Sequence, residues 1–250
     1  MAGRTVIITG GGTGIGLATA KTFARDGDTP VLIGRRSDVL ARAADSVPGA
    51  VTYQADVADP DEAAGAAEFV GEEFGTVDVL VLAAGGIGLL EPGPAVDAAP
   101  LTALAHEWTA SFRSNVLTAV LLTEALRDRL ASPGGRVLFV SSIAAYRGSG
   151  NGAYGASKAA LHPYAFDLAR ALGPRGITVN VVAPGLVVDT EFFGGRQTPE
   201  RRQALIDETL DKRAGTPGDV AETLYWLASH AASHVTAQIL QVNGGAERGR

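Results

Sequence analysis

The sequence contains no cysteine among its 250 residues. This absence excludes disulfide bridges, iron–sulfur clusters, thiolate catalysis and zinc sites built on cysteine. The sequence also lacks an apolar run long enough to cross a membrane, and the run Val6 to Ile8 is too brief for the hydrophobic region of a signal peptide. We therefore expect a soluble cytoplasmic protein with no membrane partner.

Positive charge is scarce and scattered. Lys and Arg number 21 against 27 Asp and Glu, which gives a net charge of −6 and a pI of about 5.2. Because no basic stripe stands out, we expect no nucleic-acid partner. We expect no metal site either, since His230 and His234 lie four residues apart without a third suitable ligand. The expected partner is a small molecule.

What the sequence does contain is an alternation of short β-like runs with longer segments of helical period. This alternation is typical of a doubly wound α/β fold, in which helices cover both faces of a parallel sheet. No linker or repeat interrupts it, so residues 1–250 are predicted to form a single Rossmann domain with a seven-stranded parallel sheet. The expected strands are Thr5–Thr9, Val31–Gly34, Val51–Gln54, Val79–Ala83, Arg136–Ser141, Thr178–Val182 and Ile239–Val242, and the expected helices cover 14–27, 38–46, 60–75, 107–131, 152–173 and 217–230.

Two segments depart from this alternation. Glu91–Pro100 contains three prolines and loses helical period, and the stretch from Pro184 to Arg213 is longer than an ordinary connection. Long loops at the carboxyl ends of parallel strands usually shape ligand sites. We therefore predict a substrate loop at about 186–213. Phe192 and Phe193 within it either cover an apolar substrate or pack as part of a lid.

A glycine-rich turn follows the first expected strand and opens the first expected helix. It reads Thr9-Gly-Gly-Gly-Thr13-Gly14-Ile15-Gly16. Glycines allow a tight turn and let the backbone approach a pyrophosphate, which the helix N-terminus then faces. The turn predicts a dinucleotide site formed by Gly10, Thr13, Gly14, Ile15 and Gly16, and the alternative is a turn with no ligand.

The second expected strand ends in Gly34-Arg35-Arg36-Ser37, with no acidic residue. A Rossmann enzyme that binds NAD normally places a carboxylate here to accept hydrogen bonds from the ribose 2′-OH. Two guanidiniums can instead bind a 2′-phosphate, with one stacking on adenine. Arg35 and Arg36 therefore predict NADP(H) as the preferred cofactor, with NAD(H) possible. The alternative of two solvated arginines stays open, because the glycine turn carries Thr13 rather than a basic residue.

Tyr154 and Lys158 lie four residues apart at the start of an expected helix, which places them on one face. A free tyrosine has a pKa near 10, so acid–base work near pH 7 needs about 3 units of preference for phenolate. A nearby ammonium supplies part of this preference. Alone, the pair is a weak motif, which usually means a packed ring beside a solvated lysine. The pair is accompanied by three further motifs in the chain, namely Asn115, Ser141-Ser142 and Asn180-Val-Val-Ala-Pro184-Gly185.

These motifs, in this order, resemble those of the classical short-chain dehydrogenase/reductase family, including members similar to 3-oxoacyl-carrier-protein reductases. Thr9-Gly10, Gly14 and Gly16 match its Thr-Gly-x-x-x-Gly-x-Gly form. The resemblance covers nearly the whole chain. It implies that Tyr154 donates the proton in reduction, that Lys158 lowers its pKa and binds the nicotinamide ribose, and that Asn115 anchors a water in the proton relay.

The resemblance also implies a serine that hydrogen-bonds the substrate oxygen. Ser141 lies thirteen residues before the tyrosine, as the family commonly places this serine, whereas Ser142 matches the local Ser-Ser pattern if the loop has lost one residue. We favour Ser142, because its distance from Asn115 agrees better with such a deletion.

Further cofactor contacts follow from the same resemblance. Asp56 and the backbone of Val57 would hold adenine. Ala84 and Gly85 belong to a segment where the family usually has Asn-Asn-Ala-Gly but this chain has Leu82-Ala83-Ala84-Gly85. The implied nicotinamide contacts are Pro184, Gly185, Val187 and Thr190. Plain turn or helix-cap roles are the alternatives for Asp56 and for Pro184-Gly185.

The resulting hypothesis is an NADP(H)-dependent oxidoreductase that interconverts a ketone and a secondary alcohol through a Tyr/Lys/Ser/Asn relay. A 3-oxoacyl-carrier-protein reductase is one alternative, with Arg127 and Arg129 as a thin basic docking surface. A non-catalytic NADP-binding sensor or structural relative is another. The resemblance also predicts a homotetramer. Two long helices at 107–131 and 152–173 and the apolar strand Ile239–Val242 support this prediction.

Overall fold

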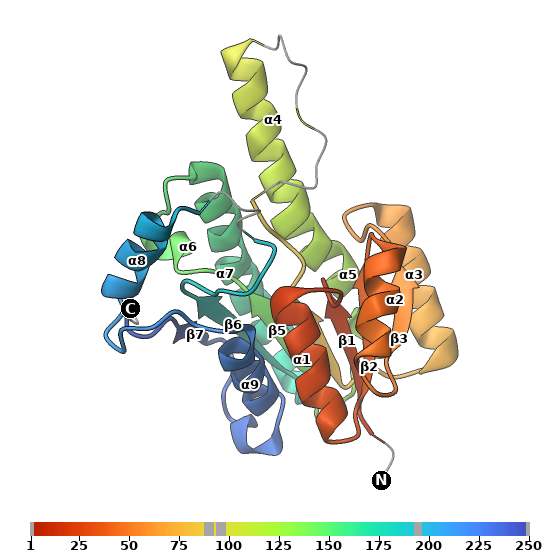
Figure 1. The fold of residues 1–250 in the computed structure, drawn as a ribbon. Helices are drawn as coiled ribbons and strands as arrows, with labels where there is room; N and C mark the ends of the chain where they lie inside the picture. Colours follow the sequence, from red (N-terminus) through yellow and green to blue (C-terminus); the bar gives the residue numbers. More distant parts are fainter. Residues whose placement is uncertain (1–2, 88–92, 94–98, 193–196, 249–250) are drawn as a thin grey trace.

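The computed structural model describes residues 3–87, 93, 99–192 and 197–248. Within these residues the strands form one parallel sheet in the order β3-β2-β1-β4-β5-β6-β7 (Figure 1). This confirms the predicted doubly wound α/β fold and its seven-stranded parallel sheet. The strands are β1 Thr5–Thr9, β2 Thr29–Gly34, β3 Val51–Gln54, β4 Val79–Leu82, β5 Arg136–Val140, β6 Thr178–Pro184 and β7 Ile239–Val242.

Helices cover both faces of this sheet (Figure 1). One face carries α1, α2 and α9, and the other carries α3, α5 and α7. The helices are α1 Gly14–Arg25, α2 Ser37–Asp45, α3 Pro60–Glu73, α4 Pro100–Phe112, α5 Thr118–Leu126, α6 Ala144–Arg147, α7 Gly152–Leu172, α8 Pro199–Asp207 and α9 Pro217–Leu227. None of the helices in the described part of the chain is long and apolar enough to cross a membrane.

Alternation along the strands divides the apolar side chains between two cores. In β5, Val137 and Phe139 pack with α3, α5 and α7, whereas Leu138 and Val140 pack with α1, α2 and α9. Because successive side chains of a strand point to opposite faces, a strand buried on both faces must be apolar throughout. This is why the central strands read as continuous hydrophobic runs.

The segment predicted as one helix at 107–131 is helical, but it begins earlier and is not α-helical throughout. Its first part, α4, begins at Pro100, where proline suits the first helical position because its fixed φ matches the helix and no amide is needed there. A π-helical turn at Arg113–Leu117 then separates α4 from α5, and a 3-10 turn at Arg127–Arg129 ends the run. Hydrophobic period alone does not reveal such a turn. The N-terminal part of α4 projects beyond the rest of the molecule (Figure 1).

Strand β2 begins two residues earlier than predicted and includes Pro30. The amide of Thr29 donates to the carbonyl of Arg4, so the nitrogen of Pro30 faces the β3 side. Pairing with β3 begins only at Val31, opposite Val51. The missing N–H of Pro30 therefore removes no hydrogen bond from the sheet.

Candidate active site

A cleft of about 1010 Å³ lies at the carboxyl ends of the strands, where the chain order reverses between β1 and β4. Of the predicted catalytic and cofactor-binding residues, all but Asn115 line this cleft, and Asn115 is fully buried next to it. The predicted residues that line the cleft are Gly10, Thr13, Gly14, Ile15, Gly16, Arg35, Arg36, Asp56, Val57, Ala84, Gly85, Ser142, Tyr154, Lys158, Pro184, Gly185, Val187 and Thr190.

The glycine turn needs glycine for two different reasons. Gly10 and Gly14 have φ values of +65° and +50°, which side chains rarely adopt. Gly16 instead has no room, because a Cβ there would lie 2.2 Å from the carbonyl oxygen of Gly10. Thr13 precedes α1 in an extended conformation, and its side chain does not cap the helix. The first amides of α1 therefore remain available for an anion at the cleft, which fits a pyrophosphate.

Arg35 and Arg36 follow β2 at one end of the cleft, as predicted. The Nη2 atom of Arg36 lies 2.8 Å from Oε2 of Glu191, a residue of the predicted substrate loop. Both side chains are substantially exposed, with 39% and 63% of their surface accessible. Sequence reasoning missed Glu191 because nothing in its local sequence indicates a contact with a residue 155 positions away.

Asp56 lines the cleft, but its carboxylate already has protein partners. One oxygen accepts from Arg113 Nη2 at 2.6 Å, and the other accepts from the amide of Ala58 at 3.2 Å. Arg113 opens the π-helical turn, so this ion pair ties the end of β3 to the segment that carries Asn115. An adenine held by Asp56 would share the carboxylate with these groups. The contact with Arg113 was not predicted.

Tyr154 lies in the first turn of α7, whose N-cap residue Asn151 accepts a hydrogen bond of 2.8 Å from the Tyr154 amide. Its side chain is buried, and the Ser142 hydroxyl is the group that favours its phenolate form. Burial raises the pKa of Tyr154 to about 12, since it disfavours the phenolate more than the Ser142 hydrogen bond favours it. In the protein alone, the phenol is therefore a neutral proton donor.

Lys158 lies one helical turn further along α7 and is also buried. Its Nζ donates a hydrogen bond of 2.9 Å to the carbonyl oxygen of Val140. Burial lowers the pKa of Lys158 to about 8. The sequence led us to expect that this ammonium, together with the bound cofactor, lowers the phenol pKa; in the protein alone burial raises that pKa, and only Ser142 opposes it.

The two candidate serines have different surroundings. Ser141 is buried, and its Oγ donates to the carbonyl oxygen of Lys158 at 3.1 Å. The same Oγ lies 2.8 Å from Nε2 of His162, which then donates to it. Ser142 Oγ accepts from the Ala144 amide at 3.1 Å, and Ser142 rather than Ser141 is the serine that lowers the pKa of the Tyr154 phenol. His162, one turn beyond Lys158 on α7, was not singled out from the sequence.

Asn115 is fully buried in the π-helical turn. Its Nδ2 donates to the carbonyls of Gly86 at 2.8 Å and Ser111 at 2.9 Å, while its Oδ1 accepts from the Gly86 amide at 2.9 Å. A Cβ on Gly85 would lie 2.4 Å from Asn115 Oδ1 and 2.9 Å from Lys158 Nζ. The absence of a side chain at Gly85 therefore allows Asn115 and Lys158 to pack against the backbone of this residue. The π-helical turn that carries Asn115 is also of a kind often found at functional sites.

The segment after β4 keeps a cross-strand hydrogen bond despite the Leu82-Ala83 departure. The Ala84 amide donates to Thr9 Oγ1 at 3.0 Å, which joins the ends of β1 and β4. At the other end of the cleft, a Cβ on Gly185 would lie 2.7 Å from Cβ of Asn243. Val187 pairs with Gly215 in an isolated bridge that holds the start of the substrate loop.

Phe192 contacts the candidate acid directly. Its ring lies edge-on to that of Tyr154, with 5.3 Å between centroids and an interplanar angle of 62°. Phe193 falls outside the described residues. Part of the predicted loop is helical, because Thr198 caps α8 by accepting from the Arg201 amide at 3.2 Å. Among the described residues no three His, Cys, Asp or Glu side chains gather as a metal site.

Comparison with known proteins places this geometry in a family. A family model described as enoyl-(acyl carrier protein) reductase matches residues 10–247. The 7α-hydroxysteroid dehydrogenase of Escherichia coli K12 is 32% identical over 97% of this chain and 94% of its own. The 3-oxoacyl-[acyl-carrier-protein] reductase MabA of Mycobacterium bovis is 34% identical over 97% of this chain and 92% of its own.

Solved structures similar to this chain belong to the same kind of enzyme. A short-chain dehydrogenase/reductase from Brucella melitensis, described as a glucose/ribitol dehydrogenase, has a TM-score of 0.87 at 30% identity, covering 98% of this chain and 97% of that one. A short chain dehydrogenase from Burkholderia cenocepacia J2315 in complex with NADP has a TM-score of 0.82 at 32% identity, covering 98% of both chains. The chain is therefore an oxidoreductase of the short-chain dehydrogenase/reductase family, whose members use NAD or NADP.

Proposed function

We propose that this enzyme uses NADP(H) to interconvert a ketone and a secondary alcohol, with Tyr154, Ser142, Lys158 and Asn115 as its catalytic residues. One observation carries the proposal. The buried Tyr154 phenol, whose pKa the Ser142 hydroxyl lowers, and the buried Lys158 ammonium line a cleft that also contains Arg35 and Arg36. The same cleft contains the glycine turn, which suits a pyrophosphate.

Each catalytic residue has a distinct task. Tyr154, neutral in the folded protein, donates its proton to the carbonyl oxygen as that oxygen gains negative charge. Ser142 hydrogen-bonds the same oxygen and orients it toward the phenol. Lys158 binds the ribose hydroxyls and stabilises the phenolate left behind, and Asn115 holds the π-helical turn against Gly86. The nicotinamide supplies the hydride when bound.

The cofactor preference rests on the residues at the end of β2. Arg35 and Arg36 provide guanidiniums where an NAD enzyme would have a carboxylate. A solved relative at 32% identity is described as a complex with NADP, which supports the same choice. We therefore propose NADP(H) as the preferred cofactor and NAD(H) as a weaker one.

The molecular surface does not favour an acyl-carrier thioester as the substrate. The MabA relative favours this alternative. However, Arg127 and Arg129 follow α5 and precede β5, so they lie at the amino ends of the strands, opposite the cleft. A carrier docked on them would lie on the side of the sheet away from the opening of the cleft. We therefore propose a small free ketone as the substrate.

Consumption of NADPH with a panel of aliphatic, cyclic and steroid ketones and a 3-oxoacyl thioester tests the function. We expect turnover with at least one member, and Tyr154→Phe should lower kcat more than tenfold while NADPH affinity changes by less than about threefold, since only the transferable proton is lost. NADPH binding without turnover of any member would favour the sensor alternative. Retention of more than a tenth of kcat in Tyr154→Phe would exclude Tyr154 as the acid.

We also propose a homotetramer. Apolar side chains remain exposed along α4 and on α7, chiefly Leu101, Leu104, Trp108 and Phe166, and Trp108 stacks on Phe112 with 6.5 Å between centroids. Exposed apolar surface of this extent usually marks a contact with another chain. The projecting α4 in Figure 1 provides a surface that a second copy could cover.

A further inference from the structure

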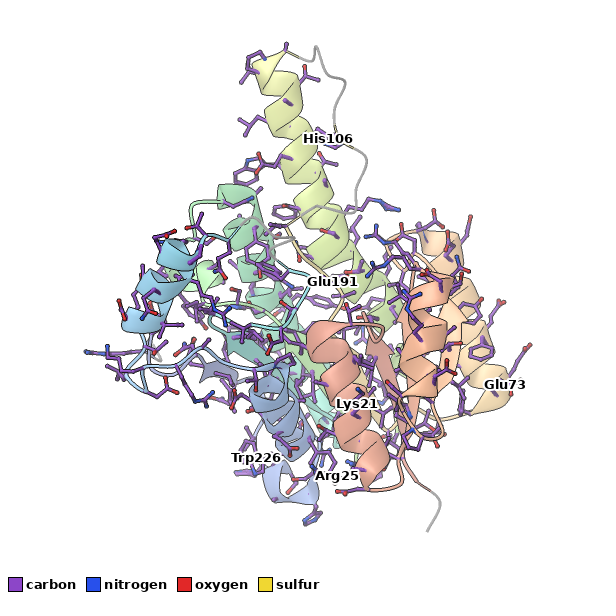
Figure 2. The ribbon with its side chains drawn as sticks, in the orientation of Figure 1. Lys21, Arg25, Glu73, His106, Glu191 and Trp226 are labelled. Carbon is purple, nitrogen blue, oxygen red and sulfur yellow. The ribbon has the colours of Figure 1, made fainter. Side chains whose placement is uncertain are left out.

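Three consecutive residues of the substrate loop contact three separate parts of the cleft. Thr190 lies over the glycine turn, because a Cβ on Gly14 would come within 3.3 Å of its Cγ2. Glu191 forms the ion pair with Arg36. Phe192 lies against the ring of Tyr154. The loop therefore reaches from the catalytic phenol to the adenosine end of the cleft. Figure 2 shows Glu191 near the N-terminal end of α1.

We propose that Glu191 is a specificity-determining residue of the cofactor site, whose carboxylate competes with the 2′-phosphate of NADP for Arg36. This rests on the proposed NADP(H) function. Arg36 Nη2 donates a hydrogen bond of 2.8 Å to Oε2 of Glu191. Both groups are charged, so this hydrogen bond is stronger than one between neutral groups. A phosphate that approaches Arg36 must replace this carboxylate or lie close to it, and two like charges repel.

The direction of the effect follows from charge. A 2′-phosphate carries nearly two negative charges and the carboxylate carries one, so the phosphate displaces Glu191, but part of its binding energy offsets the lost ion pair. ADP lacks the 2′-phosphate and does not need Arg36, so its binding leaves the pair intact. Glu191 therefore narrows the difference in affinity between nucleotides with and without a 2′-phosphate. Since Glu191 is 63% exposed, water and salt weaken this effect.

Calorimetric titration with adenosine 2′,5′-bisphosphate and with ADP tests the proposal on the protein without any substrate. Glu191→Gln removes the charge and keeps the shape. We expect it to bind adenosine 2′,5′-bisphosphate about threefold to tenfold more tightly, with ADP affinity unchanged within about twofold. The gain should shrink at roughly 0.5 M NaCl, where charges are strongly screened.

Glu222→Gln is the matched control. Glu222 also forms an exposed ion pair of 2.8 Å, with Arg25, and Figure 2 shows Arg25 at the other end of α1 from Glu191. Glu222→Gln changes the net charge by the same amount as Glu191→Gln but far from Arg36. We therefore expect it to leave the affinities for adenosine 2′,5′-bisphosphate and for ADP unchanged. In an Arg36→Ala background, Glu191→Gln should no longer raise the ratio of the two affinities, because the residue acts through Arg36.

The outcomes separate this proposal from the function on which it rests. If the wild type prefers adenosine 2′,5′-bisphosphate but Glu191→Gln does not increase that preference, Glu191 has no role in specificity and the NADP(H) function stands. An equal gain in Glu222→Gln would also overturn the proposal, because it would reflect net charge alone. If neither the wild type nor Glu191→Gln distinguishes the two nucleotides, both the NADP preference and the role of Glu191 are wrong.

Discussion

The Nζ of Lys158 donates a hydrogen bond of 2.9 Å to the carbonyl oxygen of Val140, the last residue of β5. The backbone carbonyl of the same lysine accepts from Ser141 Oγ at 3.1 Å. Lys158 is therefore fastened to the end of β5 through both its side chain and its backbone. This double attachment fixes the position of α7, and therefore of Tyr154, relative to the end of β5.

Lys158→Met should abolish most turnover and stabilise the fold. Burial lowers the pKa of Lys158 to about 8, so holding its charge in the folded state costs up to about 3 kcal/mol at pH 7. Part of this is offset by the hydrogen bond to Val140, so we expect a net gain of about 1–2 kcal/mol in the free energy of unfolding. Urea unfolding at pH 7 measures it. A less stable variant would show that the ammonium contributes more than its burial costs.

The stabilising effect of Lys158→Met should fade at high pH. Between pH 8 and the unfolded pKa near 10.5, the unfolded wild type binds more protons than the folded one, so wild-type stability from this group rises with pH. The variant lacks this gain. The two unfolding free energies should therefore converge toward pH 10.5, and a constant difference between pH 7 and pH 10 would contradict the lowered pKa.

Ketone reduction should decline above about pH 8. The pKa of Tyr154 is raised to about 12, so its phenol keeps its proton throughout this range, whereas Lys158 loses its charge near pH 8. If the ammonium is required, kcat/KM falls about tenfold per pH unit above that value. Steady-state rates between pH 6 and 10 provide the profile. A decline that begins only near pH 10 would mean that Lys158 titrates normally.

Ser142→Ala and Ser141→Ala should differ. Ser142 is the serine that lowers the pKa of the phenol, so its loss should lower kcat by about tenfold to a thousandfold with little change in stability. The Ser141 hydroxyl forms buried hydrogen bonds with the Lys158 carbonyl and with His162. Ser141→Ala removes both hydrogen bonds, so we expect it to lower the free energy of unfolding by about 1–3 kcal/mol and to affect turnover less. Measuring kcat and urea unfolding for both variants decides this, and the reverse pattern would assign the catalytic role to Ser141.

NADPH should be preferred over NADH by roughly thirtyfold in kcat/KM at low salt, which corresponds to about 2 kcal/mol. Arg35→Asp should reverse the order, because a carboxylate accepts hydrogen bonds from a ribose 2′-OH and repels a 2′-phosphate. Steady-state comparison of both cofactors in both proteins is the measurement. Equal values in the wild type would favour the interpretation of Arg35 and Arg36 as solvated residues.

Light scattering should give a mass about four times the chain mass of 25.6 kDa. Trp108→Glu should lower it, because the ring is 42% exposed on α4 and a charge there opposes burial against another copy. Ala64→Glu, on the exposed face of α3, introduces the same charge elsewhere and should leave the mass unchanged. A wild-type mass near 25.6 kDa would refute the tetramer.

Features that depend on local spacing could be predicted from the sequence. The alternation of strands and helices predicted the sheet, because strand and helix periods are local properties. Glycines at Gly10, Gly14 and Gly16 predicted the turn for the same reason, and the spacing of four placed Tyr154 and Lys158 one turn apart on α7. The roles of these residues, and the single domain, remain predictions.

The folded structure was needed for the features that depend on distant residues. It gave the two serines different surroundings, since Ser142 lowers the phenol pKa whereas Ser141 donates to the Lys158 carbonyl, and this depends on how β5 meets α7. It brought Glu191 to Arg36 across 155 positions of chain. It also buried Tyr154, which raises the pKa of the phenol in the protein alone, because burial is a property of the assembled core and no spacing along the chain encodes it.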